Sequence, residues 1–416
     1  MISIEILKEI IKENQHLDFE LTNRDIKQVK VQKIFTVIGP RRSGKTYFLF
    51  QLMKALPRER LVYLNFEDER LAELSREDLQ KILDAYFELY PDAKGKKIYL
   101  LFDEIQEVPF WSKFVRRLYD TGNFEIYLTG SSAKLLSLEI ATELRGRTWT
   151  YKILPFSFSE FLRFNNISTT QVYEQKYKIK KLFYEYLDWG GFPEICHQPE
   201  YVKAKLLQTY IDLVVYRDVI ERHKVRQTAI LDELVRYLIQ NFSREISIKK
   251  FYNLLKTKGY SLAKGTLYEF VRYLEDTLYF YFVPVYSRSK KKQLVRPKKV
   301  YLVDNGLAKA HLLPDRLDKG WLYENAVFSH LLGQDWNIFY FKKELECDFV
   351  AMKGQEKTAI QVTLNPTQER ETKGLLEAMA ELQIKKGIIV TEELDKEITI
   401  EGKRISFIPL WKFLLT

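Results

Sequence analysis

The stretch that decides the fold of this chain reads Gly39-Pro40-Arg41-Arg42-Ser43-Gly44-Lys45-Thr46. It fits the pattern G-x-x-x-x-G-K-S/T, in which glycines let successive backbone N–H groups turn inward around a phosphate. Lys45 would reach the β- and γ-phosphates of a nucleotide, and the Thr46 hydroxyl would bind Mg²⁺. Residues 39–46 are therefore predicted to bind nucleotide phosphates.

The residues on both sides of this loop support that prediction. Residues 34–38 form a short apolar run typical of a buried strand, and residues 46–53 have the pattern of a helix. Strand, loop and helix come in the order that a phosphate-binding loop requires. The alternative is a glycine turn before an ordinary helix, and the preceding strand argues against it.

Length and composition indicate a globular protein with two or three domains. The chain has 416 residues, of which 46% are hydrophobic, which is enough for substantial cores. No apolar run approaches the roughly 18 residues of a membrane span, and the N-terminus lacks a signal-peptide profile. Cys196 and Cys347 fit neither a metal nor a disulfide pattern, so we expect buried thiols in a reducing cytoplasm. The net charge of +10 permits a polyanionic partner without requiring one.

Residues 31–165 alternate short apolar runs with helical stretches, which predicts a parallel sheet wrapped by helices. The expected strands are residues 33–38, 61–66, 97–102, 125–129 and 150–154. The third strand leads into two adjacent acids, Asp103 and Glu104. Downstream of a phosphate loop, Asp103 is placed to hold Mg²⁺, directly or through water, and Glu104 to orient an attacking water. An acid in the position of Glu104 favours hydrolysis over phosphate transfer to another substrate.

Two further stretches are candidates for sensing or stabilising the γ-phosphate. Thr129 and Ser131 follow the fourth expected strand and could sense that phosphate or hold the water, although an ordinary strand-to-helix turn is the alternative. Arg145 and Arg147 flank a glycine and could supply a cationic finger to a neighbouring subunit, with Arg147 preferred. A solvated basic turn is the alternative for the arginines.

Taken together, these stretches resemble the AAA-type ATPases that are widespread in archaea and bacteria as ATP-binding proteins. The resemblance implies ATP and Mg²⁺ as ligands, ATP hydrolysis as the activity, and Arg147 as the finger candidate. It extends over nearly the whole chain and leaves the cellular role open. The matching stretches are residues 39–46, 64–68, 103–106, 129–132, 146–147, 154–161, 190–194 and 216–218.

Residues 226–305 read as three helices followed by two strands, which is the pattern of a winged helix. The turn between the strands is basic and could bind a phosphate backbone of DNA or RNA. A solvated hairpin that protects an edge strand is the alternative. The nucleic-acid candidates are Arg288, Lys290, Lys291, Lys292, Arg296, Lys298 and Lys299.

The order of elements after residue 320 resembles restriction-endonuclease-like folds. An active nuclease of that type needs an Asp followed by Glu-x-Lys, in which two carboxylates bind metal and the lysine stabilises phosphate charge. This chain has Asp348 and then Gln361-Val362-Thr363, with Glu324 on the preceding helix. Neither Gln361 nor Thr363 supplies the missing charge, and no other residue is expected to replace the lysine. Nuclease activity is therefore not expected. The domain is expected to serve in docking or assembly, or to bind nucleic acid without cutting it.

The fold class expected from the sequence is α/β: a P-loop parallel-sheet core, then a winged helix, then a degenerate restriction-endonuclease-like domain. The expected boundaries are residues 1–165, a helical linker or lid at 166–225, 226–312 and 313–416. The leading hypothesis is a Mg²⁺-dependent ATPase that rearranges domains or subunits, acting on nucleic acid. The alternatives are a signalling or scaffold ATPase with a protein partner and an ATP-regulated nuclease. An arginine finger acting between subunits would require a homo-oligomer, for example a ring.

Overall fold

The structure of the chain is a computed structural model that describes residues 2–130, 144, 146–168, 175–366 and 369–416, the last range without side chains at 369–371. It divides into two compact units, residues 1–154 and residues 155–416. Two predicted site residues, Ser131 and Arg145, lie outside the described residues. The division into four domains stays a prediction.

The first unit is built on a five-stranded sheet whose neighbouring strands all run parallel. Its order is β2-β3-β4-β1-β5. This confirms the predicted parallel core, and each observed strand matches an expected one to within two residues. Since β4 lies between β1 and β3, the carboxyl ends of the strands that carry the two motifs meet at one edge of the sheet. The bounds are β1 Ile34–Ile38, β2 Leu61–Asn65, β3 Ile98–Asp103, β4 Phe124–Thr129 and β5 Thr148–Lys152.

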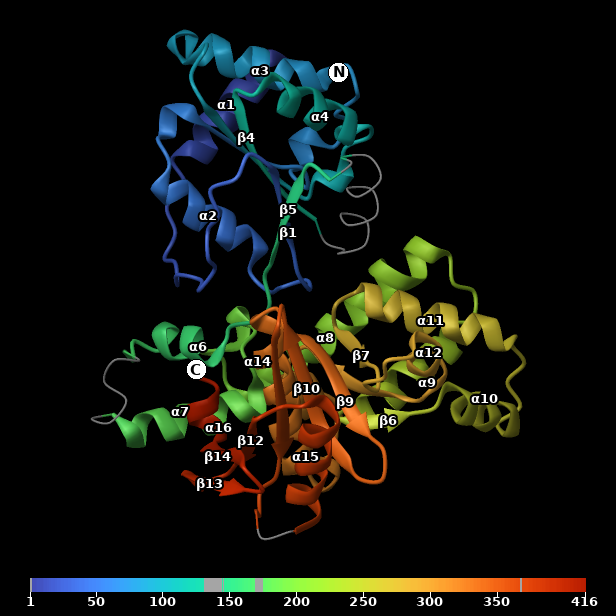
Figure 1. The fold of residues 1–416 in the computed structure, drawn as a ribbon. Coiled ribbons are helices and arrows are strands. Elements are labelled where there is room, and N and C mark those ends of the chain that lie inside the picture. The colour runs from blue at the N-terminus through green and yellow to red at the C-terminus, as the bar shows by residue number, and fades with distance from the viewer. Residues whose placement is uncertain (1, 131–143, 145, 169–174, 367–368) are drawn as a thin grey trace. The chain divides into compact units, whose positions relative to one another are not determined.

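Helices cover both faces of this sheet (Figure 1). One face packs against α1, α3 and α4 through a core that includes Leu7, Ile82 and Val115. The other face packs against α2 through Phe48 and Leu52. Burial of these apolar side chains fixes the layers, because each helix places its apolar stripe on the sheet. The helix bounds are α1 Ile4–Gln15, α2 Lys45–Ala55, α3 Asp78–Leu89 and α4 Trp111–Thr121, with 3₁₀ turns at Arg58–Arg60, Glu69–Leu71, Pro91–Ala93 and Ile105–Glu107.

The second unit begins with helices, as expected for residues 166–225. The helix α6 starts at a capping box in which Ser157 and Glu160 bond each other's backbone N–H groups. The helix α8 continues directly into a π-helix, η8, over Val214–Glu221. The other bounds are α6 Phe158–Phe164, α7 Lys176–Trp189, the 3₁₀ turn Pro193–Ile195, α8 Glu200–Leu213 and α13 Asn305–His311.

The elements after residue 226 fit the predicted winged helix. Three helices alternate with a three-stranded antiparallel sheet of order β6-β8-β7. One detail differs from the expected turn: the segment between β7 and β8 contains a short helix, α12, which Ser289 caps by accepting a hydrogen bond from the backbone N–H of Lys292. The bounds are α9 Thr228–Gln240, β6 Arg244–Ile246, α10 Ile248–Thr257, α11 Lys264–Asp276, β7 Phe280–Val283, α12 Lys290–Val295 and β8 Lys298–Leu302.

The chain ends in a six-stranded mixed sheet of order β13-β14-β12-β11-β10-β9. Strands β9, β10 and β11 form antiparallel pairs, whereas β11, β12 and β14 run parallel. This α/β arrangement confirms the expected fold class of the C-terminal region. Among the described residues, no helix is long and apolar enough to cross a membrane. The bounds are the 3₁₀ turn Pro314–Arg316, α14 Lys319–Gly333, β9 Asn337–Lys342, β10 Glu346–Lys353, β11 Glu356–Val362, α15 Glu369–Leu382, β12 Lys386–Thr391, β13 Lys396–Ile400, β14 Lys403–Pro409 and α16 Leu410–Phe413.

Candidate functional site

The predicted phosphate loop lies between the end of β1 and the start of α2. Arg42 and Gly44 have left-handed φ angles of 65° and 94°, and they turn the chain back toward the helix N-terminus. A Cβ atom on Gly39 would lie 2.0 Å from the carbonyl oxygen of Ile153, so this position has no room for a side chain. The loop backbone is thus held in a tight cradle at a helix N-terminus.

Two side chains of the loop fit a bound phosphate. The Lys45 ammonium donates to the carbonyl oxygens of Gly39 and Pro40, 3.3 and 3.2 Å away, so it lies folded over the loop itself. The Ser43 hydroxyl is buried and has no hydrogen-bond partner within the described residues. A buried hydroxyl without a partner is costly unless a ligand satisfies it. Thr46 follows Lys45 in the first turn of α2, as a Mg²⁺ ligand requires.

Arg24 supports this loop from behind and was not predicted from the sequence. Its guanidinium donates to the carbonyl oxygens of Ser43, at 2.9 Å, and of Leu154, at 2.5 Å. The side chain is buried. Because Arg24 lies in an irregular segment before β1, no local sequence pattern marks it.

The predicted acids Asp103 and Glu104 meet Thr129 at the edge of the sheet that carries the loop. The Thr129 hydroxyl donates to Oδ1 of Asp103 and accepts the backbone N–H of Glu104 at 3.0 Å. The Tyr63 hydroxyl donates to the other carboxylate oxygen of Asp103, at 3.1 Å. Asp103 and Thr129 are both fully buried. The structure therefore brings three of the predicted site residues together and adds Tyr63, a partner from β2.

Glu104 combines backbone strain with a shifted pKa. Its φ of 52° is left-handed, a conformation that a residue with a side chain adopts at a cost. Burial raises the pKa of its carboxyl above the ordinary value, although the charge of Lys45 and a hydrogen bond from Gln106 oppose the shift. The Gln106 amide donates to the Glu104 carboxylate at 2.6 Å. A carboxylate with a raised pKa is a stronger base, which suits proton abstraction from water.

Arg147 lies at the opposite edge of the same sheet. Strands β1 and β5 run parallel with Ile34 opposite Thr148, so Arg147 stands where these strands begin and the phosphate loop where they end. The Arg147 guanidinium pairs with Asp120 at 3.3 Å. It therefore cannot reach the phosphate loop of its own chain, and a finger role would require a second copy.

The basic segment between β7 and β8 is largely solvent-exposed, with one correction to the predicted set of nucleic-acid candidates. Lys299 is buried, whereas Lys298 is half-buried and the other candidates are exposed. Lys299 points away from solvent because it alternates with Lys298 along β8. It is thus removed from the nucleic-acid candidates, which are now Arg288, Lys290, Lys291, Lys292, Arg296 and Lys298.

Lys299 instead enters the predicted degenerate nuclease site. Its ammonium nitrogen lies 2.9 Å from Glu324 and 3.0 Å from Asp348. Glu346, which was not predicted, contacts the same nitrogen at 2.8 Å. The Gln361 amide donates to Asp348 at 2.7 Å. We call Lys299, Glu324, Glu346 and Asp348 the Lys299 cluster.

The Lys299 cluster corrects one expectation and leaves one predicted residue outside. No residue was expected to replace the lysine missing at Thr363, yet Lys299 brings an ammonium group into the site from a strand 49 residues before Asp348. The hydroxyl of Thr363 turns instead to the carbonyl oxygen of Asn365, at 3.0 Å. A linear motif could not reveal this lysine, because it comes from the sheet of the winged helix.

Three known protein families match successive regions of the chain. Residues 31–162 match the family described as an AAA domain, and residues 180–317 and 319–413 match two families described as domains of unknown function. An uncharacterised protein of Methanocaldococcus jannaschii is 38% identical over 432 residues, which cover 99% of this chain and 95% of the relative. An uncharacterised protein of Haemophilus influenzae is 31% identical over 412 residues, which cover 97% and 99%. The chain belongs to this family of AAA-domain proteins.

The AAA domain confirms the resemblance stated from the motifs and makes the first unit a nucleotide-binding fold. Among solved structures, the ORC1 protein of Aeropyrum pernix in complex with DNA has 14% identity and a TM-score of 0.25, covering 79% of this chain and 93% of that one. A similarity at this level carries no argument about the activity or partners of this AAA-domain protein.

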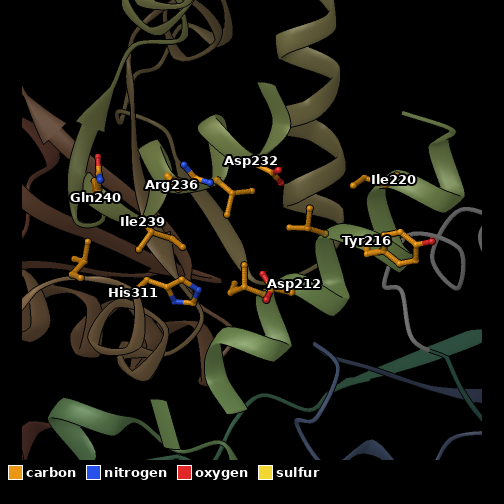
Figure 2. Close-up of a pocket in the computed structure, with 12 residues that line it drawn as sticks. Asp212, Tyr216, Ile220, Asp232, Arg236, Ile239, Gln240 and His311 are labelled. Atoms are coloured by element: carbon orange, nitrogen blue, oxygen red, sulfur yellow. The ribbon is translucent and has the colours of Figure 1, made fainter. Parts of the chain in front are cut away.

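The AAA-domain protein also has a cleft in its second unit that no motif predicted. It has a volume of about 480 Å³ and lies between η8, α9 and the end of α13. Figure 2 shows that Asp212, Tyr216, Asp232, Arg236 and His311 surround it. Burial lowers the pKa of His311, so this imidazole is neutral near pH 7. The π-helix that forms one wall is the one local signal of this cleft, because such helices recur at functional sites.

Proposed function

We propose that this AAA-domain protein is a Mg²⁺-dependent ATPase. The observation that carries the proposal is the buried arrangement of Asp103, Glu104 and Thr129 at the sheet edge where the phosphate loop begins. An acid pair held in this way, next to a phosphate cradle, has the parts that water attack on a γ-phosphate needs. A nucleotide-binding protein without hydrolysis would not need the second acid.

Each residue takes a role that its position allows. The Lys45 ammonium, which now bonds two loop carbonyl oxygens, would move to the β- and γ-phosphates. Thr46 and Asp103 would hold Mg²⁺, which supplies charge neutralisation to the phosphates. Glu104 would accept a proton from the attacking water, and Thr129 would hold the Glu104 backbone in place through its hydroxyl. Arg24 would keep the loop fixed while these groups act.

Two substitutions test the ATPase proposal. Lys45→Ala is expected to abolish nucleotide binding, measured by calorimetric titration with ATP and Mg²⁺. Glu104→Gln is expected to bind ATP and retain it, because an amide cannot accept the proton. Lys54→Ala is the matched control, since Lys54 lies on the same helix and its ammonium contacts the carbonyl oxygen of Phe19. Hydrolysis by Glu104→Gln at the parent rate would show that Glu104 is not the base.

We further propose that hydrolysis drives a rearrangement of domains or subunits on DNA or RNA. The support is the basic segment between β7 and β8. Within the described part of the chain, no carboxylate lies within ion-pair distance of Arg288, Lys290, Lys291 or Lys292, and all four are exposed. Unpaired cations on an exposed segment attract a phosphate backbone with a strong salt dependence.

The nucleic-acid proposal is tested by ATP turnover with and without duplex DNA or RNA at two salt concentrations. We expect stimulation that weakens as salt rises. Lys290→Ala/Lys291→Ala should reduce both the binding and its salt slope by about two units. Lys94→Ala/Lys96→Ala, which removes two exposed lysines of the first unit, is the matched control. Turnover that ignores nucleic acid, with no salt-sensitive binding, would favour a protein partner and a signalling or scaffold role.

A homo-oligomer is proposed from the position of Arg147. Because Arg147 stands at the sheet edge opposite its own loop, the γ-phosphate it could reach belongs to a neighbouring copy. The expected result is that Arg147→Ala loses turnover while it keeps ATP binding, and that wild-type turnover per chain rises with protein concentration. A turnover independent of concentration, with full activity in Arg147→Ala, would remove the finger role.

A further inference from the structure

In the Lys299 cluster, three carboxylates surround one ammonium group. Glu346 and Asp348 are two residues apart on β10 and therefore lie on the same face of the strand. Glu324 reaches the same point from α14, and Lys299 from β8. The three carboxylates lie 2.9, 2.8 and 3.0 Å from one ammonium nitrogen. An ammonium group has three N–H donors, so each carboxylate receives one.

Three of the four cluster residues are buried, whereas the Glu346 side chain is 31% exposed. Lys299 is 3% exposed, Glu324 is 9% exposed and Asp348 is 8% exposed. Neighbouring groups add further hydrogen bonds. The Tyr301 hydroxyl donates at 2.5 Å to the same Glu324 oxygen that contacts Lys299, and Gln361 and the backbone N–H of Val362 donate to the second oxygen of Asp348. Lys342, which is partly exposed, pairs with the outer oxygen of Glu346 at 3.1 Å.

Carboxylates gathered in this way are ligands that Mg²⁺ and Mn²⁺ take in proteins. Here their inner oxygens converge on the nitrogen of Lys299. We propose that the Lys299 ammonium is an internal cation that takes the place of a divalent metal ion in this site. The C-terminal sheet therefore holds its carboxylates without metal, and the strand β8, at the base of the basic segment, is anchored to that sheet.

The proposal predicts that removing Lys299 turns the cluster into a metal site. Without the ammonium, three carboxylates face one another in a buried place, which strongly destabilises the fold. A divalent cation can relieve that repulsion, and a ligand that binds only the folded state raises the unfolding temperature. Lys299→Met keeps an unbranched apolar stem of similar length and removes the ammonium group with its charge, so it isolates this effect.

The test compares full-length, nucleotide-free proteins by thermal unfolding with and without MnCl₂ and by Mn²⁺ titration followed by electron paramagnetic resonance. Wild type gives the baseline for Mn²⁺ bound elsewhere, for example at the phosphate loop. We expect Lys299→Met to unfold at a lower temperature than wild type, to regain stability in Mn²⁺ and to bind one additional Mn²⁺ ion. Lys299→Met/Asp348→Asn should lose that extra site, with Mn²⁺ affinity lower by roughly tenfold or more.

Two controls complete the test. Lys342→Met removes the other lysine of the region but leaves Lys299 in place, so it should gain no Mn²⁺ site. Asp348→Asn in the wild-type background should bind as much Mn²⁺ as wild type. The proposal is overturned if wild type carries a Mn²⁺ ion that Asp348→Asn loses, because the metal would then already displace the lysine. It is equally overturned if Mn²⁺ fails to stabilise Lys299→Met. Neither result depends on whether the protein hydrolyses ATP.

Discussion

At the scale of single residues, the nucleotide site depends on one hydroxyl. Thr129 bonds both the Asp103 carboxylate and the Glu104 backbone, so it connects the proposed metal ligand to the proposed base. Neither acid can shift without breaking a buried hydrogen bond, and such a loss costs about 1–3 kcal/mol when it leaves a polar group unsatisfied. The precision of the site therefore rests on a residue from the neighbouring strand β4.

Thr129→Val is expected to lower the ATP turnover rate roughly 10- to 100-fold while ATP affinity changes little, because the phosphate loop is untouched. The measurement is steady-state hydrolysis together with an ATP titration. Thr36→Val is a matched control: Thr36 is also buried in the sheet, and its hydroxyl bonds that of Thr150 at 2.8 Å, away from the acids. Equal losses in both variants would show that Thr129 acts through stability alone.

The pH dependence of turnover should report on Glu104. Burial raises the pKa of this carboxyl above its ordinary value, and a base acts only when it is ionised. Activity is thus expected to be full above the raised pKa and to fall as the pH drops through it, so the acid limb should lie above the ordinary pKa of a glutamate carboxyl. Gln106→Leu removes a hydrogen bond that favours the ionised form, so it should move that limb to higher pH. An acid limb at or below the ordinary value would contradict this.

At the scale of elements, a glycine pair organises the start of the second unit. The backbone N–H of Gly191 donates to the buried Asp304 carboxylate at 2.7 Å, and its carbonyl oxygen accepts the N–H of Phe156 at 2.7 Å. Gly190 has a left-handed φ of 76°. In the sequence, residues 190–194 stand out only as a stretch that matches the AAA-type ATPases. The structure shows that this stretch joins α7 to the turn that begins α13.

Gly191→Ala should destabilise the second unit by about 1–3 kcal/mol, because a Cβ atom there would lie 2.3 Å from the carbonyl oxygen of Phe156. The measurement is the midpoint of urea unfolding followed by tryptophan fluorescence. Gly265→Ala is the matched control, since a Cβ atom at Gly265 meets open space within α11 and alanine favours a helix. We expect that control to be neutral or slightly stabilising, and an equal loss in both variants would contradict the close contact at Gly191.

At the scale of the whole molecule, the chain combines two compact units with separate cores. Residues 1–154 contain the nucleotide site, and residues 155–416 contain the basic segment, the Lys299 cluster and the cleft. Within the second unit, the winged helix and the C-terminal sheet share buried ion pairs through Lys299. Lys299 is therefore one of the buried contacts that connect the basic segment to the last sheet.

Calorimetric unfolding is expected to show two transitions, one for each unit. ATP with Mg²⁺ should raise only the transition of residues 1–154, by an amount that corresponds to about 2.7 kcal/mol when the ligand is at 100 times its dissociation constant. Lys45→Ala should remove that shift and leave both transitions in place. A single transition that ATP shifts as a whole would show that the two units unfold cooperatively.

Much of the nucleotide site was predictable because its signals are local. The strand β1, the loop 39–46 and the start of α2 follow one another along the chain, and Asp103 and Glu104 end an apolar strand. The strand, the phosphate loop and the helix can therefore be predicted directly from the order of residues along the chain. Arg24 and Tyr63 were missed because their roles arise from contacts that no periodicity records.

The sequence by itself determined the class of ligand, the parallel core and the loss of the Glu-x-Lys pattern at Gln361 and Thr363. Only the tertiary structure decided where Lys299 lies. In the sequence it belongs to a run of basic residues, and it was therefore predicted to lie on a surface that binds nucleic acid. The physical reason is that successive side chains along β8 point to opposite faces of the strand, so Lys298 and Lys299 face different surroundings. On the buried face, three carboxylates from α14 and β10 contact the Lys299 ammonium. A run of basic residues in the sequence gives the number of positive charges, whereas the fold decides which of them form ion pairs.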